Sequence, residues 1–185
     1  SIVEVKMFDN KKLIKAIDKF KNGDTSAFNH IYEQTNRLIY YTIYPIVKDH
    51  ALAEDIMQNV FIKIYENIDS YTERNSPKAW IVTIARNLAI NEYNHKKREV
   101  IVDIDTIDYL DNTEETKETP LIDLAEEHLE EDEFIIVMLC ICEGYKRREV
   151  AEITGLSTSG VTWKLHNALE KLKSITEGGA IDENK

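Results

Sequence analysis

The chain has 185 residues, of which 43% are apolar, and a formal net charge of −11. This length and apolar content suit one packed domain or two small ones. The sequence contains neither an apolar run of roughly eighteen residues nor a signal-type leader, which argues against membrane insertion and predicts a cytoplasmic protein. With only 6 glycines and 3 prolines, and with apolar residues at helical spacing, the chain is predicted to be all-α.

Charge divides the chain into blocks. Residues 11–98 carry a net +4 and residues 146–176 a net +3, whereas 99–120 carry −7 and 121–145 carry −8. We therefore predict two small helical domains, 11–98 and 121–176, joined by an acidic linker at 99–120. The linker could span at most roughly 70 Å, so two DNA-binding units could lie along one duplex.

Residues 11–47 predict two scaffold helices, and 49–68 predict a long third helix whose core face is wide. The opposite stripe of this third helix consists of Asp55, Gln58, Asn59, Ile62 and Glu66. An isoleucine inside an acidic and amide stripe is typical of a protein-contact face, although a solvated face with one exposed apolar residue fits equally well.

The next predicted helix runs from Ser76 to Arg98. Ser76 can cap its first turn, and Pro77 occupies a position where a first turn tolerates proline. The predicted buried stripe consists of Trp80, Ile81, Ile84, Ala85 and Leu88. The other face carries arginine, asparagine and lysine, which suits nucleic acid, but an ordinary solvated face is the simpler alternative.

Residues 121–129 and 132–142 predict two further helices, and 147–173 predict a helix-turn-helix. Ala151 fits the tight contact between its helices, Gly155 the turn, and Val161 anchors the second helix. The outward residues that we expect to contact DNA are Ser157, Ser159, Thr162, Trp163, Lys164, His166 and Asn167. A helical hairpin that contacts protein remains the alternative.

No enzyme chemistry is indicated. The 5 histidines are scattered, the 2 cysteines are too few for a zinc site, and no nucleophile or phosphate loop occurs. We expect no catalytic residue, metal or cofactor.

Three segments together resemble the extracytoplasmic-function (ECF) sigma factors of bacterial RNA polymerase, within the sigma-70 family. Residues 49–65 (DHALAEDIMQNVFIKIY) and 79–91 (AWIVTIARNLAIN) are similar to region two, and 143–157 (EGYKRREVAEITGLS) with the following helix are similar to region four. The resemblance covers residues 11–176 in the same order.

The resemblance implies an alternative sigma factor that binds core RNA polymerase, directs promoter-specific initiation and melts the minus-ten element. In that family the helix over 49–68 binds the clamp helices of the largest subunit, so Asp55, Gln58, Asn59, Ile62 and Glu66 would contact polymerase. Region four meets the flap of the second large subunit. An anti-sigma factor that covers these surfaces is also implied.

The family's minus-ten element is read by the loop and helix of region two, with a flipped base held near Asn87. The residues implied for this role are Tyr71, Arg74, Lys78, Trp80, Arg86, Asn87, Lys96, Lys97 and Arg98. The helix after Ser157 would read the minus-thirty-five element. Here Thr162 and Trp163 stand where lysine and serine are usual, which predicts weaker duplex binding.

Two rival functions use the same helices. A stand-alone helix-turn-helix regulator would bind its operator without polymerase, and a protein-interaction module would bind no DNA.

Overall fold

The computed structural model describes residues 10–74, 76–102 and 120–179, and all regular structure in these ranges is helical. The prediction of an all-α fold is confirmed. The N-terminal unit consists of α1 (Asn10–Lys21), α2 (Ala27–Val47), α3 (His50–Asn67), the short turn η1 (Ile68–Ser70) and α4 (Pro77–Val102). The C-terminal unit consists of α5 (Pro120–His128), α6 (Glu131–Val137), the π-helical turn η2 (Met138–Cys142), α7 (Arg147–Thr154) and α8 (Thr158–Gly179).

The N-terminal unit forms because its helices bury apolar residues in a common core. Asp49 caps α3, since its carboxylate accepts a hydrogen bond from the Leu52 amide at 2.9 Å. Pro45 lies inside the last turn of α2 without ending it. α4 continues to Val102 rather than ending at Arg98 as predicted, because neither glycine nor proline intervenes.

The C-terminal unit differs from the prediction in two helices. The single helix expected over 132–142 is divided into α6 and η2, and Gly144 follows at a φ of +70°. α8 extends to Gly179, beyond the expected end at Lys173. Cys142, on η2, is exposed.

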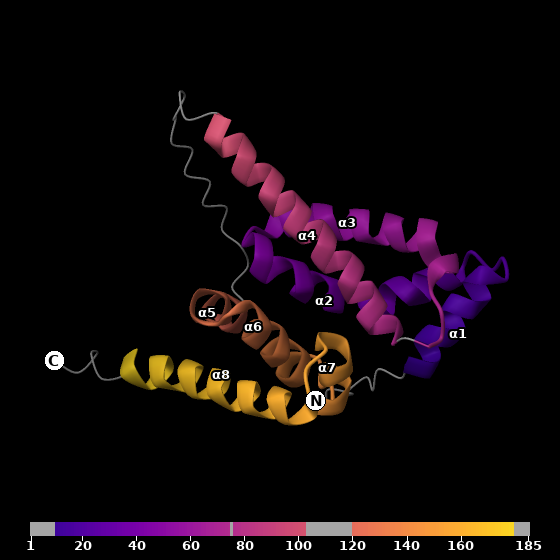
Figure 1. The fold of residues 1–185 in the computed structure, drawn as a ribbon. Helices are drawn as coiled ribbons and strands as arrows, with labels where there is room; N and C mark the ends of the chain where they lie inside the picture. The colour runs from indigo at the N-terminus through magenta and orange to yellow at the C-terminus, as the bar shows by residue number, and fades with distance from the viewer. Residues whose placement is uncertain (1–9, 75, 103–119, 180–185) are drawn as a thin grey trace.

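The two units lie against each other (Figure 1). Their buried apolar residues form one shared core. α6 lies on α2, and α7 lies on α4. The ring of the buried Phe134 on α6 lies 6.4 Å from the ring of Tyr41 and 6.0 Å from that of Tyr44, both on α2. The extended placement along a duplex that the linker allows is thus not the arrangement seen. Residues 103–119, most of the predicted linker, lie outside the described residues.

Candidate nucleic-acid interface

The start of α4 is fixed by its cap and by its buried face. The Ala79 amide donates to Ser76 Oγ at 3.4 Å, and the fully buried Ile81 and Ala85 hold the helix against the core. Arg86 therefore lies on the face of α4 that points away from this core, and its side chain is 47% exposed. Trp80, Ile84 and Leu88 were predicted to be buried but are only partly so. Their place in the core is shared with Ala89, whose small side chain is fully buried.

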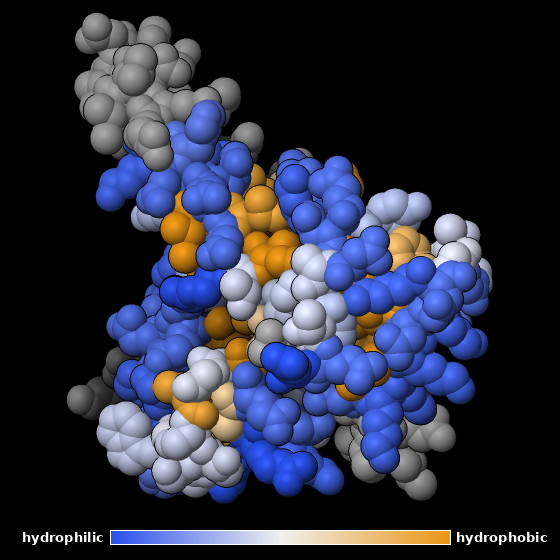
Figure 2. All heavy atoms as spheres, turned by 45° about the vertical axis from the view of Figure 1, so that its right-hand side comes forward, coloured by the Kyte–Doolittle hydropathy of each residue, from blue (hydrophilic) through white to orange (hydrophobic). Residues whose placement is uncertain are grey.

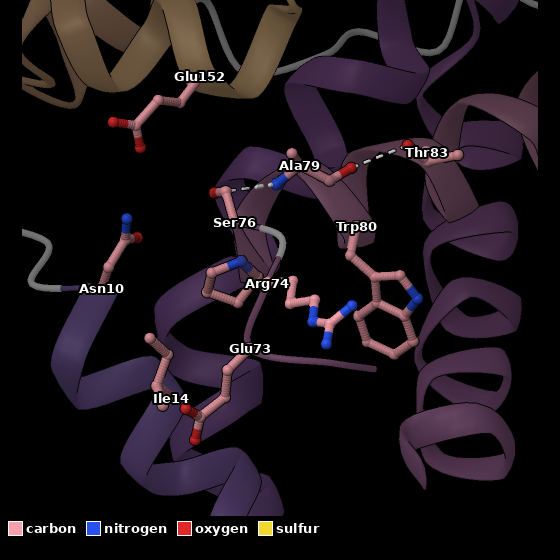
Figure 3. Close-up of a pocket in the computed structure, with 10 residues that line it drawn as sticks. Asn10, Ile14, Glu73, Arg74, Ser76, Ala79, Trp80, Thr83 and Glu152 are labelled. Atoms are coloured by element: carbon pink, nitrogen blue, oxygen red, sulfur yellow. Dashed lines mark hydrogen bonds between the residues drawn. The ribbon is translucent and has the colours of Figure 1, made fainter. Parts of the chain in front are cut away.

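A pocket of about 680 Å³ opens beside this start (Figure 3). Trp80 and Arg74 form one wall, Asn10 of α1 another, and Glu152 of α7 faces them from the C-terminal unit. The Asn10 Oδ1 atom is buried and has no hydrogen-bond partner among the described residues. Behind the pocket, the buried Tyr71 ring lies 5.5 Å from that of Trp80. The pocket thus offers an aromatic ring, a cation and an unsatisfied amide oxygen.

A second pocket, of about 530 Å³, lies farther along α4 between the two units. Arg86 and Asn87 line one side, and Glu130, Glu131 and Asp132 at the start of α6 line the other. Arg86 forms an ion pair with Glu131. Arg86 and Asn87 of α4 thus face carboxylates of the C-terminal unit.

The helix-turn-helix has the geometry that its sequence predicts. Gly155 adopts a φ of +73°, and its amide donates to the Ala151 carbonyl at 2.9 Å. Ser157 Oγ caps α8 by accepting from the Gly160 amide at 3.0 Å. Val161 is fully buried, which fixes the orientation of α8.

The outer face of α8 carries little free positive charge. Trp163 is 64% exposed, and His166 is also exposed. Lys164 forms an ion pair with Asp132 of α6. Burial alone would raise the pKa of the Asp132 carboxyl, but the bond to Lys164 outweighs this effect and the pKa is lowered. Lys171 Nζ lies 2.8 Å from each carboxylate oxygen of Glu133.

The outer face of α3 presents its predicted stripe to solvent. Asp55, Gln58, Asn59 and Glu66 are exposed, and Ile62 is 54% exposed. Tyr65 is 52% exposed, although its ring packs edge-on against Phe20 at 5.0 Å. In the view of Figure 2, apolar residues show only as patches within a mostly hydrophilic surface.

Comparison with known proteins identifies the family. Models of Sigma-70 region 2 and Sigma-70 region 4 match residues 31–99 and 121–172. The RNA polymerase sigma factor SigZ of Bacillus subtilis (strain 168) is 31% identical over 136 residues, which make up 71% of this chain and 77% of SigZ. The chain belongs to the sigma-70 family of RNA polymerase sigma factors.

Further relatives refine this assignment. The ECF RNA polymerase sigma factor SigX of the same organism is 26% identical over 167 residues, covering 82% of this chain and 84% of SigX. The protein is thus an ECF sigma factor that directs promoter-specific transcription initiation by RNA polymerase, which excludes the stand-alone regulator.

Two solved structures share the fold. The sigma factor RpoE from Bartonella quintana, in complex with the anti-sigma factor NepR, matches with a TM-score of 0.60 at 20% identity over 81% of this chain and 96% of RpoE. CnrH, in complex with the cytosolic domain of CnrY, matches with a TM-score of 0.56 at 17% identity over 92% of this chain and 98% of CnrH.

The structure brings some of the predicted minus-ten residues of the sigma factor together and separates others. Arg74 and Trp80 share the first pocket, and Arg86 and Asn87 share the second. Lys96 and Lys97 are exposed near the far end of α4, and the side chain of Arg98 is not among those described.

Two predicted contacts are not at the surface. Tyr71 is 3% exposed, with a pKa that burial raises, and Lys78 is 1% exposed. The Lys78 ammonium lies 4.3 Å from the centre of the Tyr145 ring in the C-terminal unit. In the packed arrangement neither side chain is free to reach DNA, because core and inter-unit contacts cover both.

Sequence reasoning missed the inter-unit contacts and the part played by Asn10. The alternation of basic and acidic blocks was the signal for the former, since such blocks attract within one chain as well as between molecules.

None of the described helices has the length and apolar character that crossing a membrane requires. Within the described ranges, no three metal-binding side chains come together.

Proposed function

We propose that the pocket at the start of α4 takes an unpaired base of the minus-ten element, and that promoter melting occurs here. The observation that carries this proposal is the pocket wall formed by Trp80 and Arg74 beside the Asn10 Oδ1 atom, which has no hydrogen-bond partner among the residues that the structure describes. An aromatic ring stacks on a base, a guanidinium binds a phosphate or stacks, and an amide oxygen accepts from an exocyclic amine. This chemistry suits a single strand better than a duplex.

The face of α4 that carries Arg86 and Asn87 would hold the strand next to that base. The Asn87 amide is exposed and can pair with a base edge, and Arg86 can bind a phosphate. Lys96 and Lys97, also exposed, would follow the backbone toward duplex DNA. Both pockets lie along one helix, as one continuous strand requires.

The helix-turn-helix would read the minus-thirty-five element with α8 in the major groove. Trp163 and His166 are exposed for this, and Ser157 and Ser159 lie at the helix start. Thr162, Lys164 and Asn167 are partly buried. The pairing of Lys164 with Asp132 supports the expectation of weak duplex binding, because a neutralised lysine releases fewer counterions.

The stripe on α3 would bind the clamp helices of the largest polymerase subunit, with Ile62 as the apolar centre of a polar face. The C-terminal unit would meet the flap of the second large subunit. By likeness to RpoE, which was solved with the anti-sigma factor NepR, we infer that an anti-sigma factor also binds this chain. The protein would act in the cytoplasm as an initiation factor without enzyme activity.

In vitro transcription tests the strand contact proposed for Asn87 on α4. With core polymerase and a promoter selected from genomic DNA, Asn87→Ala should lower permanganate reactivity of the minus-ten strand about tenfold, since one base contact contributes roughly 1–3 kcal/mol. Polymerase binding in a pull-down should stay intact. Asn29→Ala, which removes an exposed amide on α2, is the matched control. Loss of polymerase binding by Asn87→Ala, or normal opening, would contradict the assignment.

A further inference from the structure

We propose that carboxylates of the C-terminal unit form an intramolecular latch on the N-terminal unit, so that the sigma factor closes over its own single-strand site. The effect of this latch on DNA binding rests on the minus-ten site proposed above. The closed arrangement itself is a separate claim, which can be tested without DNA.

Every inter-unit ion pair among the described residues has the same polarity. Arg86 pairs with Glu131, Arg37 pairs with Glu143, and the Lys48 ammonium lies 3.5 Å from the Glu126 carboxylate. In each pair the cation belongs to the N-terminal unit and the carboxylate to the C-terminal unit. The contact of Lys78 with the Tyr145 ring adds a fourth cation held in the same direction.

The Arg37 pair is the best shielded of the three. The Glu143 side chain is only 9% exposed, and Arg37 also donates to the Tyr41 hydroxyl at 2.9 Å. Burial alone would lower the pKa of the Arg37 guanidinium, but the bond to Glu143 and the neighbouring Tyr41 raise it on balance. The pair is thus held in one geometry and partly protected from salt.

The carboxylates lie where phosphates would lie. Glu131 forms an ion pair with the Arg86 guanidinium, which a phosphate would otherwise bind. Together with Glu130 and Asp132, Glu131 faces Asn87 across the second pocket. At the first pocket, the Glu152 carboxylate faces the space beside Arg74 (Figure 3). A DNA strand and these acidic side chains would compete for the same space and charge, so strand binding requires the units to separate.

The interface also has an apolar centre. Phe134 packs against Tyr41 and Tyr44 and is fully buried. Such an arrangement, an apolar core with a charged rim, resembles a protein–protein interface. The apolar part is insensitive to salt, whereas the ion pairs at the rim weaken as salt rises. Charge therefore adjusts how often the closed form opens.

The test uses the full chain with Glu131→Gln and Glu143→Gln combined. Small-angle X-ray scattering reports closure, and anisotropy of a labelled mixed-sequence single-stranded oligodeoxynucleotide reports access. Glu127→Gln combined with Glu170→Gln is the control, because it removes two exposed carboxylates of the same unit that make no inter-unit ion pair in the described structure. Net charge therefore changes equally in both proteins.

At low salt the Glu131/Glu143 variant should have a larger radius of gyration than the wild type and bind the oligonucleotide about fivefold more tightly, since two such pairs shift the equilibrium by about that factor. The control should match the wild type in size. Equal sizes of the two variants would overturn the latch. Expansion of the Glu131/Glu143 variant without strand binding by any protein would support the latch and contradict the proposed minus-ten site instead.

Discussion

The ion pair between Glu133 and Lys171 should stabilise the C-terminal unit more than a surface ion pair does. It joins α6 to α8, with the Lys171 Nζ 2.8 Å from both carboxylate oxygens. The Glu133 side chain is 10% exposed and the Lys171 side chain 47% exposed. Glu133 also accepts from the Glu130 amide at 3.1 Å, which caps α6. Lys171→Met would leave this shielded carboxylate without its cation.

The expected cost lies between two limits. An exposed ion pair contributes up to about 1 kcal/mol, whereas breaking a buried one costs roughly 3–5 kcal/mol. Because water reaches Lys171 but hardly reaches Glu133, we expect Lys171→Met to lower the free energy of unfolding by about 1.5 kcal/mol. For a chain of this size, that corresponds to a fall in Tm of roughly 3–6 °C.

A double-mutant cycle with Glu133→Gln and Lys171→Met measures the coupling free energy by urea unfolding, followed by circular dichroism. The control cycle uses Lys63 and Glu66 on α3, a pair at 3.2 Å whose side chains are 53% and 54% exposed. That pair should couple by only about 0.3 kcal/mol. A coupling between Glu133 and Lys171 no larger than that of the control would refute the reasoning from burial.

Three further predictions concern stability. Phe134→Ala should lower the free energy of unfolding by about 3–5 kcal/mol in urea titrations, because its ring is fully buried between the units, and a loss below about 1 kcal/mol would contradict its central place. Gly155→Ala should cost about 1 kcal/mol in thermal unfolding, since a φ of +73° strains any residue with a Cβ; an unchanged Tm would argue against this turn geometry. Burial raises the pKa of Tyr44 to about 12. The unfolded phenol ionises near pH 10, so the stability from Tyr44 is complete below about pH 10 and falls as pH rises toward 12. The loss of unfolding free energy between pH 9 and pH 11 should therefore be smaller in Tyr44→Phe than in the wild type.

The local pattern of the sequence determined most of the helices and their inward faces. A predicted helix that begins at Asp49 matches α3, and Gly155 predicts the turn before α8. These signals act over one or two helical turns, so they are legible without knowing the fold. The segments 49–65 and 79–91 together also carried the family resemblance.

Only the tertiary structure decided which of the candidate contacts are open. Lys78 and Tyr71 are of residue types that often contact DNA. In the structure, however, the Lys78 ammonium lies against the Tyr145 ring, and Tyr71 lies in the core. Lys164 belongs to a basic block, yet Asp132 neutralises it. The partners are distant in sequence, and helical periodicity carries no information about them.

The packing of the two units was likewise beyond the sequence. The charge blocks show that the C-terminal unit can attract the N-terminal unit, but the same charges would suit a spacer in solvent. The packing of the units is decided by the shape of the apolar contact at Phe134, which also brings Arg86 and Glu131 together. Such complementarity depends on side chains brought together from α2, α4 and α6, and therefore exists only in the folded chain.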